Sequence, residues 1–321
     1  MKIDMKHMLK IVVAILVLCI AAALICLTVF AEDDDVADSC EHTAEFVAAN
    51  ISLDKDISLK YYVKLCNCYK DAKMVFSSGR SSITKAAYYD AEADEYVFTL
   101  TRIAPHAMGD LINAELVYND EVIAVKENYS ILENCKNLLE KYPDDEKMQY
   151  LIKALLNYGA EAQNFFQYNL GNLANSFLSK DETKVEKISD PANVYAQTGD
   201  GQKIKSVSLI CGSEIGFKFM TDAALGATAY TLEIADNADF TDATEVEMVA
   251  TENGDEYKAI VSVGNDKMAE TFYVRVLVDG TAGATLTYSV ESYLARNFDT
   301  VDNTLYYLML SMVAYGRACA A

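Results

Sequence analysis

The chain of 321 residues has no tryptophan, only three histidines and far fewer basic than acidic residues. Its 27 lysine and arginine residues stand against 48 aspartate and glutamate residues, which gives a formal net charge of −21. A surface this acidic repels the phosphates of nucleic acids and of anionic lipids, so we expect neither as a partner. The missing tryptophan counts against a glycan-binding surface, because its ring offers the largest aromatic face for a sugar.

Motifs of common hydrolases and nucleotide-binding proteins are missing as well. The chain contains no Gly-x-Ser-x-Gly, no His-Glu-x-x-His and no glycine-rich phosphate-binding loop. His106 follows Pro105 in a predicted loop, where a general base is one interpretation. Because no nucleophile signature lies beside it, we interpret His106 as a surface histidine. Carboxylate pairs are too numerous for one to be selected, so we predict no catalytic residue and no cofactor.

The N-terminus is typical of a secretory signal or a membrane anchor. Lys2, Lys6 and Lys10 precede residues 11–31, a run of 21 residues without a charge. The run ends in Val-Phe-Ala, which suits cleavage before Glu32, and it is also long enough to span a bilayer. We therefore predict a signal peptide or N-terminal anchor, with the rest of the chain secreted or held at the outer face of the cytoplasmic membrane. Membrane contact is expected only through this run, if it is retained.

The exported part is predicted to hold two domains behind an acidic spacer. Removing residues 1–31 takes away three lysines and one aspartate, so 24 basic and 47 acidic residues remain, with a net charge of −23. The remaining 290 residues suggest about two domains. We assign residues 32–50, which begin with Glu-Asp-Asp-Asp, to an acidic spacer, with a first strand or short helix near Phe46 as the alternative for its last residues.

Six cysteines remain after residue 31, and we predict that most are free. They are Cys40, Cys66, Cys68, Cys135, Cys211 and Cys319. Cys135 and Cys319 fall on apolar faces of predicted helices, where a thiol behaves as a small hydrophobic group. Cys66 and Cys68 are expected on the polar side of an extended strand, where a bridge between residues two apart would be strained. We interpret them as incidental free cysteines; exposed thiols able to cross-link to another chain are the alternative hypothesis.

Two parts of the chain are similar to one another at an offset of 157 to 161 residues. The matching ranges, in order, are 56–62 and 214–220, 94–100 and 255–261, 111–120 and 271–280, 128–134 and 287–293, and 155–162 and 312–319. Five segments in the same order predict a tandem pair of modules, because the period is as long as a domain.

Each module is predicted to be mainly β with helices, an α+β arrangement. Apolar and polar residues alternate from Ile57 to Leu65, as in a half-buried strand. Asp279-Gly280, and Asn119-Asp120 in the first copy, are tight-turn signals between strands. We predict two tandem immunoglobulin- or fibronectin-like β-sandwiches, each followed by a C-terminal helical pair. The boundaries are 51–169 for module 1, with helices 130–142 and 145–168, and 204–321 for module 2, with helices 289–298 and 303–319. Residues 170–203 between them are predicted to be an exposed linker with a short ordered start at residues 173–178.

Tyr-Gly occurs inside the last predicted helix of each module. Tyr158-Gly159 and Tyr315-Gly316 both lie on apolar stripes. A helix-interior glycine costs about 1 kcal/mol relative to alanine, so a glycine in both copies suggests close approach of another element. We interpret these four residues as helix-packing positions; a ligand lying against the glycine is the alternative.

Asp236, Asp239 and Asp242 in the sequence DNADFTD are weak calcium candidates. Their oxygens suit calcium, but their spacing differs from that of an EF-hand loop. Asp and Asn also favour turns, so a turn without an ion is the other interpretation. Calcium is the only cofactor that the sequence offers.

Residues 110–130 together with LLNYGAEAQ (155–163) and LANSFL (173–178) resemble a module of large surface proteins of Firmicutes. Residues 230–243 also resemble a strand and turn of a fibronectin type III-like sandwich. The first resemblance implies a Gram-positive cell-surface or secreted protein with an adhesive or structural role and no established catalytic activity.

We therefore expect a non-enzymatic protein that binds an unknown extracellular protein or polysaccharide. The alternatives are a glycan-binding accessory module and a secreted hydrolase with unidentified carboxylates. For glycan binding, the candidate tyrosines are Tyr61, Tyr62, Tyr88 and Tyr89.

Overall fold

The computed structural model describes residues 42–53, 56–79, 81–185, 196–211, 215–297 and 303–321. The predicted signal or anchor, most of the acidic spacer, Cys40 and the side chain of Cys211 lie outside this description. The chain divides into two compact units, residues 1–43 with 66–68, and residues 44–65 with 69–321. None of the described helices is both long and apolar enough to cross a membrane.

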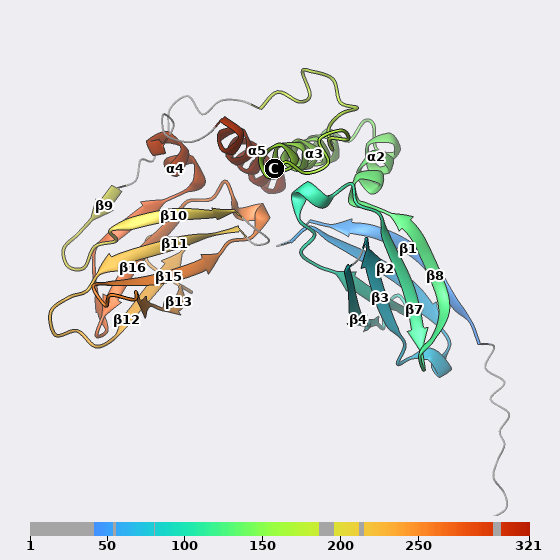
Figure 1. The fold of residues 1–321 in the computed structure, drawn as a ribbon, viewed down its shortest axis with the longest axis horizontal. Helices are drawn as coiled ribbons and strands as arrows, with labels where there is room; N and C mark the ends of the chain where they lie inside the picture. Colours follow the sequence, from blue (N-terminus) through green and yellow to red (C-terminus); the bar gives the residue numbers. More distant parts are fainter. Residues whose placement is uncertain (1–41, 54–55, 80, 186–195, 212–214, 298–302) are drawn as a thin grey trace, which may run out of the picture. The chain divides into compact units, whose positions relative to one another are not determined.

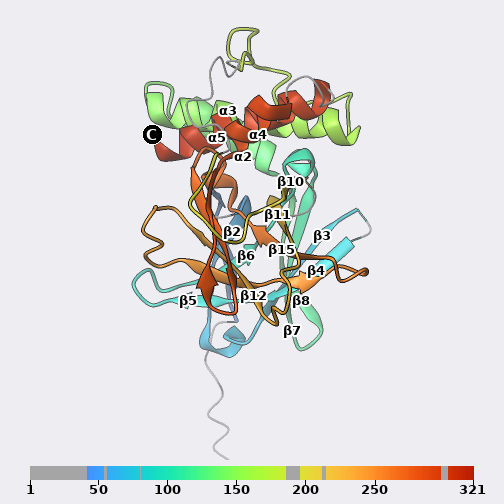
Figure 2. The same ribbon diagram turned by 90° about the vertical axis from the view of Figure 1, so that its left-hand side faces the viewer.

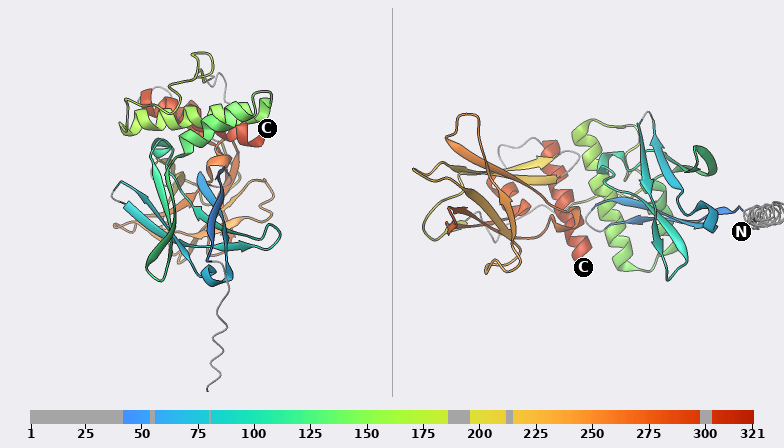
Figure 3. Two further views of the ribbon diagram at one scale, coloured as in Figure 1. Left: turned by 90° about the vertical axis from the view of Figure 1, so that its right-hand side faces the viewer. Right: turned by 90° about the horizontal axis from the view of Figure 1, so that it is seen from below.

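The first half of the larger unit contains two four-stranded sheets (Figures 1 and 3). One has the order β1 (Ala44–Ser52), β2 (Ser58–Leu65), β6 (Glu95–Leu100) and β5 (Tyr88–Asp90). The other has the order β4 (Ser81–Ala86), β3 (Lys73–Ser78), β7 (Ile112–Tyr118) and β8 (Glu121–Tyr129). Every strand pair in them is antiparallel.

The two sheets pack through the apolar positions that the sequence predicts. Ile57, Leu59, Tyr61 and Val63 are all completely buried, which confirms the predicted alternation of β2. The ring of Tyr61 lies 5.4 Å from that of Phe76 on β3 and 5.9 Å from that of Tyr129 on β8, centroid to centroid. These contacts join one sheet to the other and form the core between them.

The second half of the larger unit also contains two sheets (Figures 1 and 2). One has the order β10 (Ser206–Cys211), β11 (Ile215–Asp222), β15 (Glu256–Ser262) and β14 (Val249–Ala250). The other has the order β13 (Thr244–Glu247), β12 (Tyr230–Ala235), β16 (Phe272–Val278), β18 (Thr285–Tyr288) and β9 (Ala196–Thr198), with β17 (Thr281–Ala282) paired to β16. Phe217 on β11 packs edge-on against Tyr288 on β18, with centroids 4.9 Å apart.

Corresponding strands of the two halves pair in the same order. The order β1-β2-β6-β5 is matched by β10-β11-β15-β14, and β4-β3-β7-β8 is matched by β13-β12-β16-β18. A short 3-10 turn stands before β7 and before β16: η2 (Pro105–Ala107) and η3 (Asn265–Lys267). A further 3-10 turn, η1 (Asn67–Tyr69), follows β2.

The predicted tight turns are present in both halves. Asn119 and Asp120 have φ angles of 50° and 64°, and Asp279 and Gly280 have φ angles of 46° and 80°. Two consecutive positive φ angles characterise the turns that match the twist of a β-hairpin. Asn, Asp and Gly tolerate this conformation best.

The helices begin and end within two residues of the predicted positions. They are α2 (Ile131–Lys141), α3 (Glu146–Phe166), α4 (Val290–Asn297) and α5 (Asn303–Ala320). The Ser130 side chain accepts a hydrogen bond from the Glu133 amide, and the Asp145 side chain accepts one from the Met148 amide. These caps satisfy amides that have no partner inside the helix. The structure is thus mainly β with helices, as predicted.

Three segments differ from the sequence-based boundaries. Strand β1 begins at Ala44, so the last residues of the predicted spacer belong to a sheet, in line with the alternative of a first strand near Phe46. Strand β9, at the end of the predicted linker, pairs with β18. The ordered start of the linker is longer than the predicted residues 173–178. The Ala174 amide donates to Gln163 Oε1 on α3, and Ala174 is buried, while the Asn157 side chain on α3 donates to Glu182 O. Composition predicts that such segments are linkers or spacers. It does not show that a strand or a helix side chain offers hydrogen-bond partners that hold them in place.

Candidate functional site

An apolar row crosses the outer face of the β1-β2-β6-β5 sheet. Ala48 is directly opposite Tyr62, Tyr62 is opposite Val97, and Val97 is opposite Tyr88. Residues opposite one another in antiparallel strands point to the same face. On the other face of the same strands lies the buried Val63, so this row faces solvent. We call Ala48, Tyr62, Val97 and Tyr88 the tyrosine row.

The tyrosine row is unusual because the solvent face of an antiparallel sheet is normally polar. Tyr88 is 72% exposed, and Tyr62 and Val97 are partly exposed. The two tyrosines are two strands apart, which corresponds to about 10 Å. The next row on this face is polar, since Asn50 is opposite Lys60. The row therefore offers aromatic surface with hydrogen-bonding groups beside it.

The other candidate tyrosines lie elsewhere. Tyr61 is completely buried in the core, because it is on the inward face of β2, and it is no candidate for binding. Tyr89 is 45% exposed but lies on the opposite face from Tyr88. Its hydroxyl donates to Asp94 Oδ1 at 2.7 Å, and its ring packs against Tyr96 with centroids 4.9 Å apart. Tyr62 and Tyr88 are therefore the pair that the structure brings to one surface.

The two Tyr-Gly pairs occupy packing positions. A Cβ atom on Gly159 would come within 2.9 Å of Met108 Sδ and 3.2 Å of Ala174 Cβ. A Cβ atom on Gly316 would come within 2.7 Å of the Ala269 amide nitrogen. Met108 follows η2, and Ala269 comes shortly after η3. Each glycine therefore lets its helix approach the 3-10 turn of its own half, which accounts for the glycine without a ligand.

The tyrosines beside those glycines meet each other. The rings of Tyr158 on α3 and Tyr315 on α5 are stacked, with centroids 5.8 Å apart and an interplanar angle of 26°. Both rings are buried. Burial also raises the pKa of the Tyr315 hydroxyl, since a phenolate there would lack hydration. The stack joins helices from the two halves.

His106 lies in η2 between two aromatic rings. Its ring centroid is 4.9 Å from that of Phe166 and 5.0 Å from that of Tyr168. Partial burial lowers the pKa of the His106 imidazole, and the nearby Asp110 carboxylate offsets some of this. Asp110 Oδ2 itself accepts a hydrogen bond from the Tyr168 hydroxyl at 2.7 Å. His106 is therefore packed in an aromatic cluster, whereas the sequence predicts a surface loop histidine. The sequence does not indicate this packing, because Phe166 and Tyr168 are far from His106 in the chain.

The three calcium candidates are dispersed in the turn between β12 and β13. Asp236, Asp239 and Asp242 are all exposed. In the described part of the chain, the three acidic, histidine or cysteine side chains close enough together to hold a metal ion are His42, Cys66 and Cys68. None of the three aspartates belongs to this set. Asn237 instead organises this turn, since its side chain donates to Thr241 O and accepts from the Thr241 amide. The turn interpretation fits this geometry.

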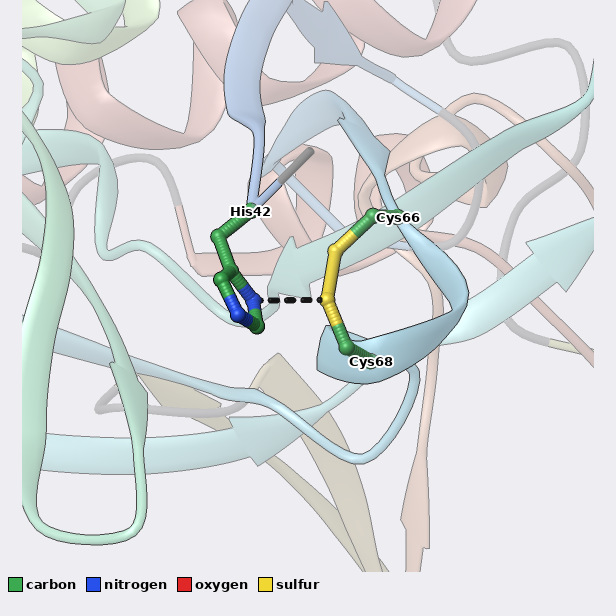
Figure 4. The surroundings of a disulfide bond; sticks show 3 residues. All are labelled: His42, Cys66 and Cys68. Carbon is green, nitrogen blue, oxygen red and sulfur yellow. Dashed lines mark hydrogen bonds between the residues drawn. A yellow bond between two sulfur atoms is a disulfide. The ribbon is translucent and has the colours of Figure 1, made fainter. Parts of the chain in front are cut away.

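Cys66 and Cys68 form a disulfide, so the prediction of exposed free thiols is wrong for this pair (Figure 4). The strand was expected to continue through both cysteines, but β2 ends at Leu65 and the 3-10 turn η1 follows. The turn sets the two Cα atoms 5.3 Å apart, within the usual range for a disulfide. Both cysteines are half-buried. Sequence spacing alone gave no signal of this turn.

His42 completes a cluster with this disulfide. Its Nδ1 atom lies 3.1 Å from Cys68 Sγ (Figure 4). The ligand atoms of His42, Cys66 and Cys68 all lie within 4.8 Å of one another. The sequence does not indicate that His42 lies beside the cysteines, because 26 residues separate it from Cys68.

The free cysteines within the described residues are Cys135, which is buried, and Cys319, which is partly buried. Burial raises the pKa of the Cys135 thiol to about 12, so it stays protonated and unreactive at neutral pH. Both behave as the predicted small hydrophobic groups.

A cavity of about 400 Å³ lies between α3, α5 and residues 181–185. Three of its charged residues form ion pairs: Lys153 Nζ is 2.8 Å from Glu182 Oε1, and Arg317 pairs with Glu291. Because these pairs neutralise much of the charge that a ligand could meet, we regard this cavity as a weaker candidate than the tyrosine row. Comparison with models of known protein families gave no match, and comparison with curated proteins gave none either.

Proposed function

We propose that this chain is an exported, non-enzymatic protein of the bacterial cell surface that has an adhesive or structural binding role. Its N-terminal sequence and acidic composition support export. The tyrosine row is the observation that carries the binding role, because contiguous apolar residues on a solvent-facing sheet typically mark an interaction surface.

We further infer a tandem pair of immunoglobulin-like sandwiches as the scaffold. An immunoglobulin-type sandwich has strands A, B, E and D in one sheet, and C, F and G in the other, with C′ added beside C in many members. Numbered in chain order, the first half has A-B-E-D as β1-β2-β6-β5 and C′-C-F-G as β4-β3-β7-β8. The second half repeats both orders. The internal sequence similarity supports descent of both halves from one ancestral module.

Binding of the exported chain to surface material tests the proposal. The chain would be fluorescently labelled and incubated with immobilised bacterial cell-wall polymer and with mucin. We expect saturable binding to one of them that weakens at least about tenfold in Tyr88→Ala, since exposed tyrosines that a partner covers are typical binding hot spots. The matched control is Tyr307→Ala, a tyrosine of α5 that is 44% exposed but lies off the row. Equal binding by both variants would exclude the row as the binding surface.

Glycan binding is the narrower form of this proposal, and the spacing of the row favours it. Two tyrosines on strands about 10 Å apart, with Asn50 and Lys60 on the adjacent row, can stack on sugar rings and form hydrogen bonds with their hydroxyls. A glycan array probed with the whole chain would show hits that are lost in Tyr62→Ala and Tyr88→Ala. Binding to protein targets only would instead favour adhesion to a protein.

A further inference from the structure

We propose that the Cys66–Cys68 disulfide is a thiol–disulfide exchange site. In this site an incoming thiol attacks Cys66 Sγ, and Cys68 departs as a thiolate held by His42. The substrate class is a dithiol, either a small molecule or a pair of cysteines on another protein. The argument rests on the size of the loop, on the contact of His42 Nδ1 with Cys68 Sγ, and on the corresponding segment in the second half of the chain.

The loop closed by this disulfide is too short to make it an effective structural cross-link. The two cysteines are separated by two positions in the sequence. Stabilisation by a disulfide comes mainly from restricting the unfolded chain, and it decreases as the loop becomes shorter. A bridge across a single intervening residue therefore adds little to the stability of the fold.

The second half of the chain folds without such a bridge. Strand β2 is followed by Cys66-Asn67-Cys68, whereas its counterpart β11 is followed by Ala223, Ala224 and Leu225. Both strands nevertheless hold the same place in their sheets. The fold does not require cysteines at this point, so these two residues call for another explanation.

His42 makes the two sulfurs of the disulfide unequal. A disulfide sulfur carries lone pairs and no hydrogen, so at 3.1 Å the Nδ1–H of His42 is the donor and Cys68 Sγ the acceptor. The Cys66 amide donates to Thr43 O at 3.1 Å, which ties the segment carrying His42 to the segment carrying the disulfide. Negative charge that develops on Cys68 is thus stabilised by a donor already in place.

The exchange balances in two steps. A thiolate of the dithiol attacks Cys66 Sγ, the Cys66–Cys68 bond breaks, and its electron pair goes to Cys68, which becomes a thiolate beside His42. The second thiol of the substrate then loses its proton to solvent and attacks the substrate sulfur of the mixed disulfide, which releases Cys66 as a thiolate. The substrate is oxidised to a disulfide, and the cysteine pair is reduced by two electrons. A good leaving thiolate accelerates the first step.

The first test measures the rate at which dithiothreitol reduces the chain in its expressed, oxidised form. Stopped samples are alkylated, and the labelled cysteines are counted by peptide mass spectrometry. We expect His42→Ala to slow reduction about tenfold or more, because it removes a hydrogen bond to a charged group. His42→Asn, which keeps an N–H donor, should recover part of the rate, and Thr43→Ala should equal the original chain. Cys135 is an internal control, since its buried thiol should remain unlabelled while the fold is intact.

The second test needs no variant and identifies the attacked sulfur. The oxidised chain is mixed with glutathione, quenched with acid and digested, and the glutathione adduct is located. An adduct on Cys66 supports the proposal, because it shows that the incoming thiolate attacked Cys66 and that Cys68 departed. The proposal is wrong if the adduct falls on Cys68, if no adduct forms before the chain unfolds, or if His42→Ala and Thr43→Ala are reduced at the same rate.

Discussion

At the scale of single residues, the two glycines of the Tyr-Gly pairs differ in what they touch. The atoms nearest to a Cβ on Gly159 belong to the flexible end of Met108, whereas those nearest to a Cβ on Gly316 are backbone atoms of Met268 and Ala269. A side-chain end can move at small cost, but a backbone segment within a turn cannot. The same motif is therefore expected to tolerate substitution differently in its two copies.

We predict that Gly316→Ala destabilises the protein and that Gly159→Ala does not do so appreciably. Both substitutions gain about 1 kcal/mol of helix propensity. At Gly316 the overpacking costs about 1–3 kcal/mol, which outweighs the gain, while at Gly159 the two effects nearly cancel. Urea unfolding followed by far-UV circular dichroism measures both. A larger loss for Gly159→Ala than for Gly316→Ala would contradict the packing described for the two helices.

His106 gives a prediction for pH. Burial lowers its pKa below the ordinary value of 6.5, so the unfolded chain binds a proton at this residue before the folded chain does. Stability contributed by neutral His106 is therefore complete above pH 6.5 and decreases as the pH falls towards the lowered pKa. The urea midpoint should fall more between pH 7 and pH 5 in the original chain than in His106→Gln. Identical pH dependence of the two would show that the imidazole titrates as if exposed.

At the scale of secondary-structure elements, we expect a buried helix cap to contribute more to the free energy of unfolding than an exposed one. Ser130 is buried and Asp145 is exposed, although each accepts a hydrogen bond from an amide of the first helical turn. Replacing a cap costs about 0.5–2 kcal/mol. We expect Ser130→Ala near the upper end, because its hydrogen bond to the Glu133 amide is partly shielded from water, and Asp145→Ala near the lower end, because its hydrogen bond is exposed. Asp145→Asn, which keeps the acceptor, is the control, and the reverse order of costs would argue against this account.

The elements that could be predicted from the sequence are those with local signals. Ser130 and Asp145 mark helix starts, the alternation from Ile57 to Leu65 marks a strand, and Asp279-Gly280 marks a hairpin turn. A strand near Phe46 could be predicted only as an alternative to the spacer, because a register shift between Phe46 and Ala48 interrupts the alternation of β1. The disulfide was missed for a similar reason, since a 3-10 turn replaced the expected end of β2.

Function-related contacts were less predictable than elements, because they join residues that are distant in the chain. Tyr62 and Tyr88 share a face only through the pairing of β2 and β5 with β6. The sequence named both as candidates but could not separate them from the buried Tyr61. His42 and Cys68 meet for the same kind of reason, since their contact depends on how strand ends are aligned.

At the scale of the whole molecule, α3 and α5 link the two halves of the larger unit. The sequence predicted an apolar stripe on each helix, but periodicity does not identify the partner of a stripe. The structure stacks Tyr158 on Tyr315, and the Tyr158 hydroxyl lies 3.5 Å from Asn265 Oδ1 in η3. Contacts of this kind couple the unfolding of the two halves.

We predict a coupling energy of about 0.5–1.5 kcal/mol between Tyr158 and Tyr315, beyond the effect of burial. Tyr158→Leu, Tyr315→Leu and the double variant form the mutant cycle, measured by urea unfolding. The control cycle pairs Tyr158→Leu with Phe76→Leu, whose ring packs on Tyr61 in the first core. Additive effects in the first cycle would mean that the stacked rings do not interact energetically.

The central claim is that the solvent-facing tyrosine row binds an extracellular polymer. Affinity electrophoresis of the exported chain through gels containing cell-wall polysaccharide tests it most directly, because migration reports binding without a label. The account predicts that the original chain and Tyr307→Ala are retarded equally, while the double variant Tyr62→Ala/Tyr88→Ala migrates as it does in a gel without polysaccharide. Retardation of the double variant to the same extent as the original chain would contradict the account.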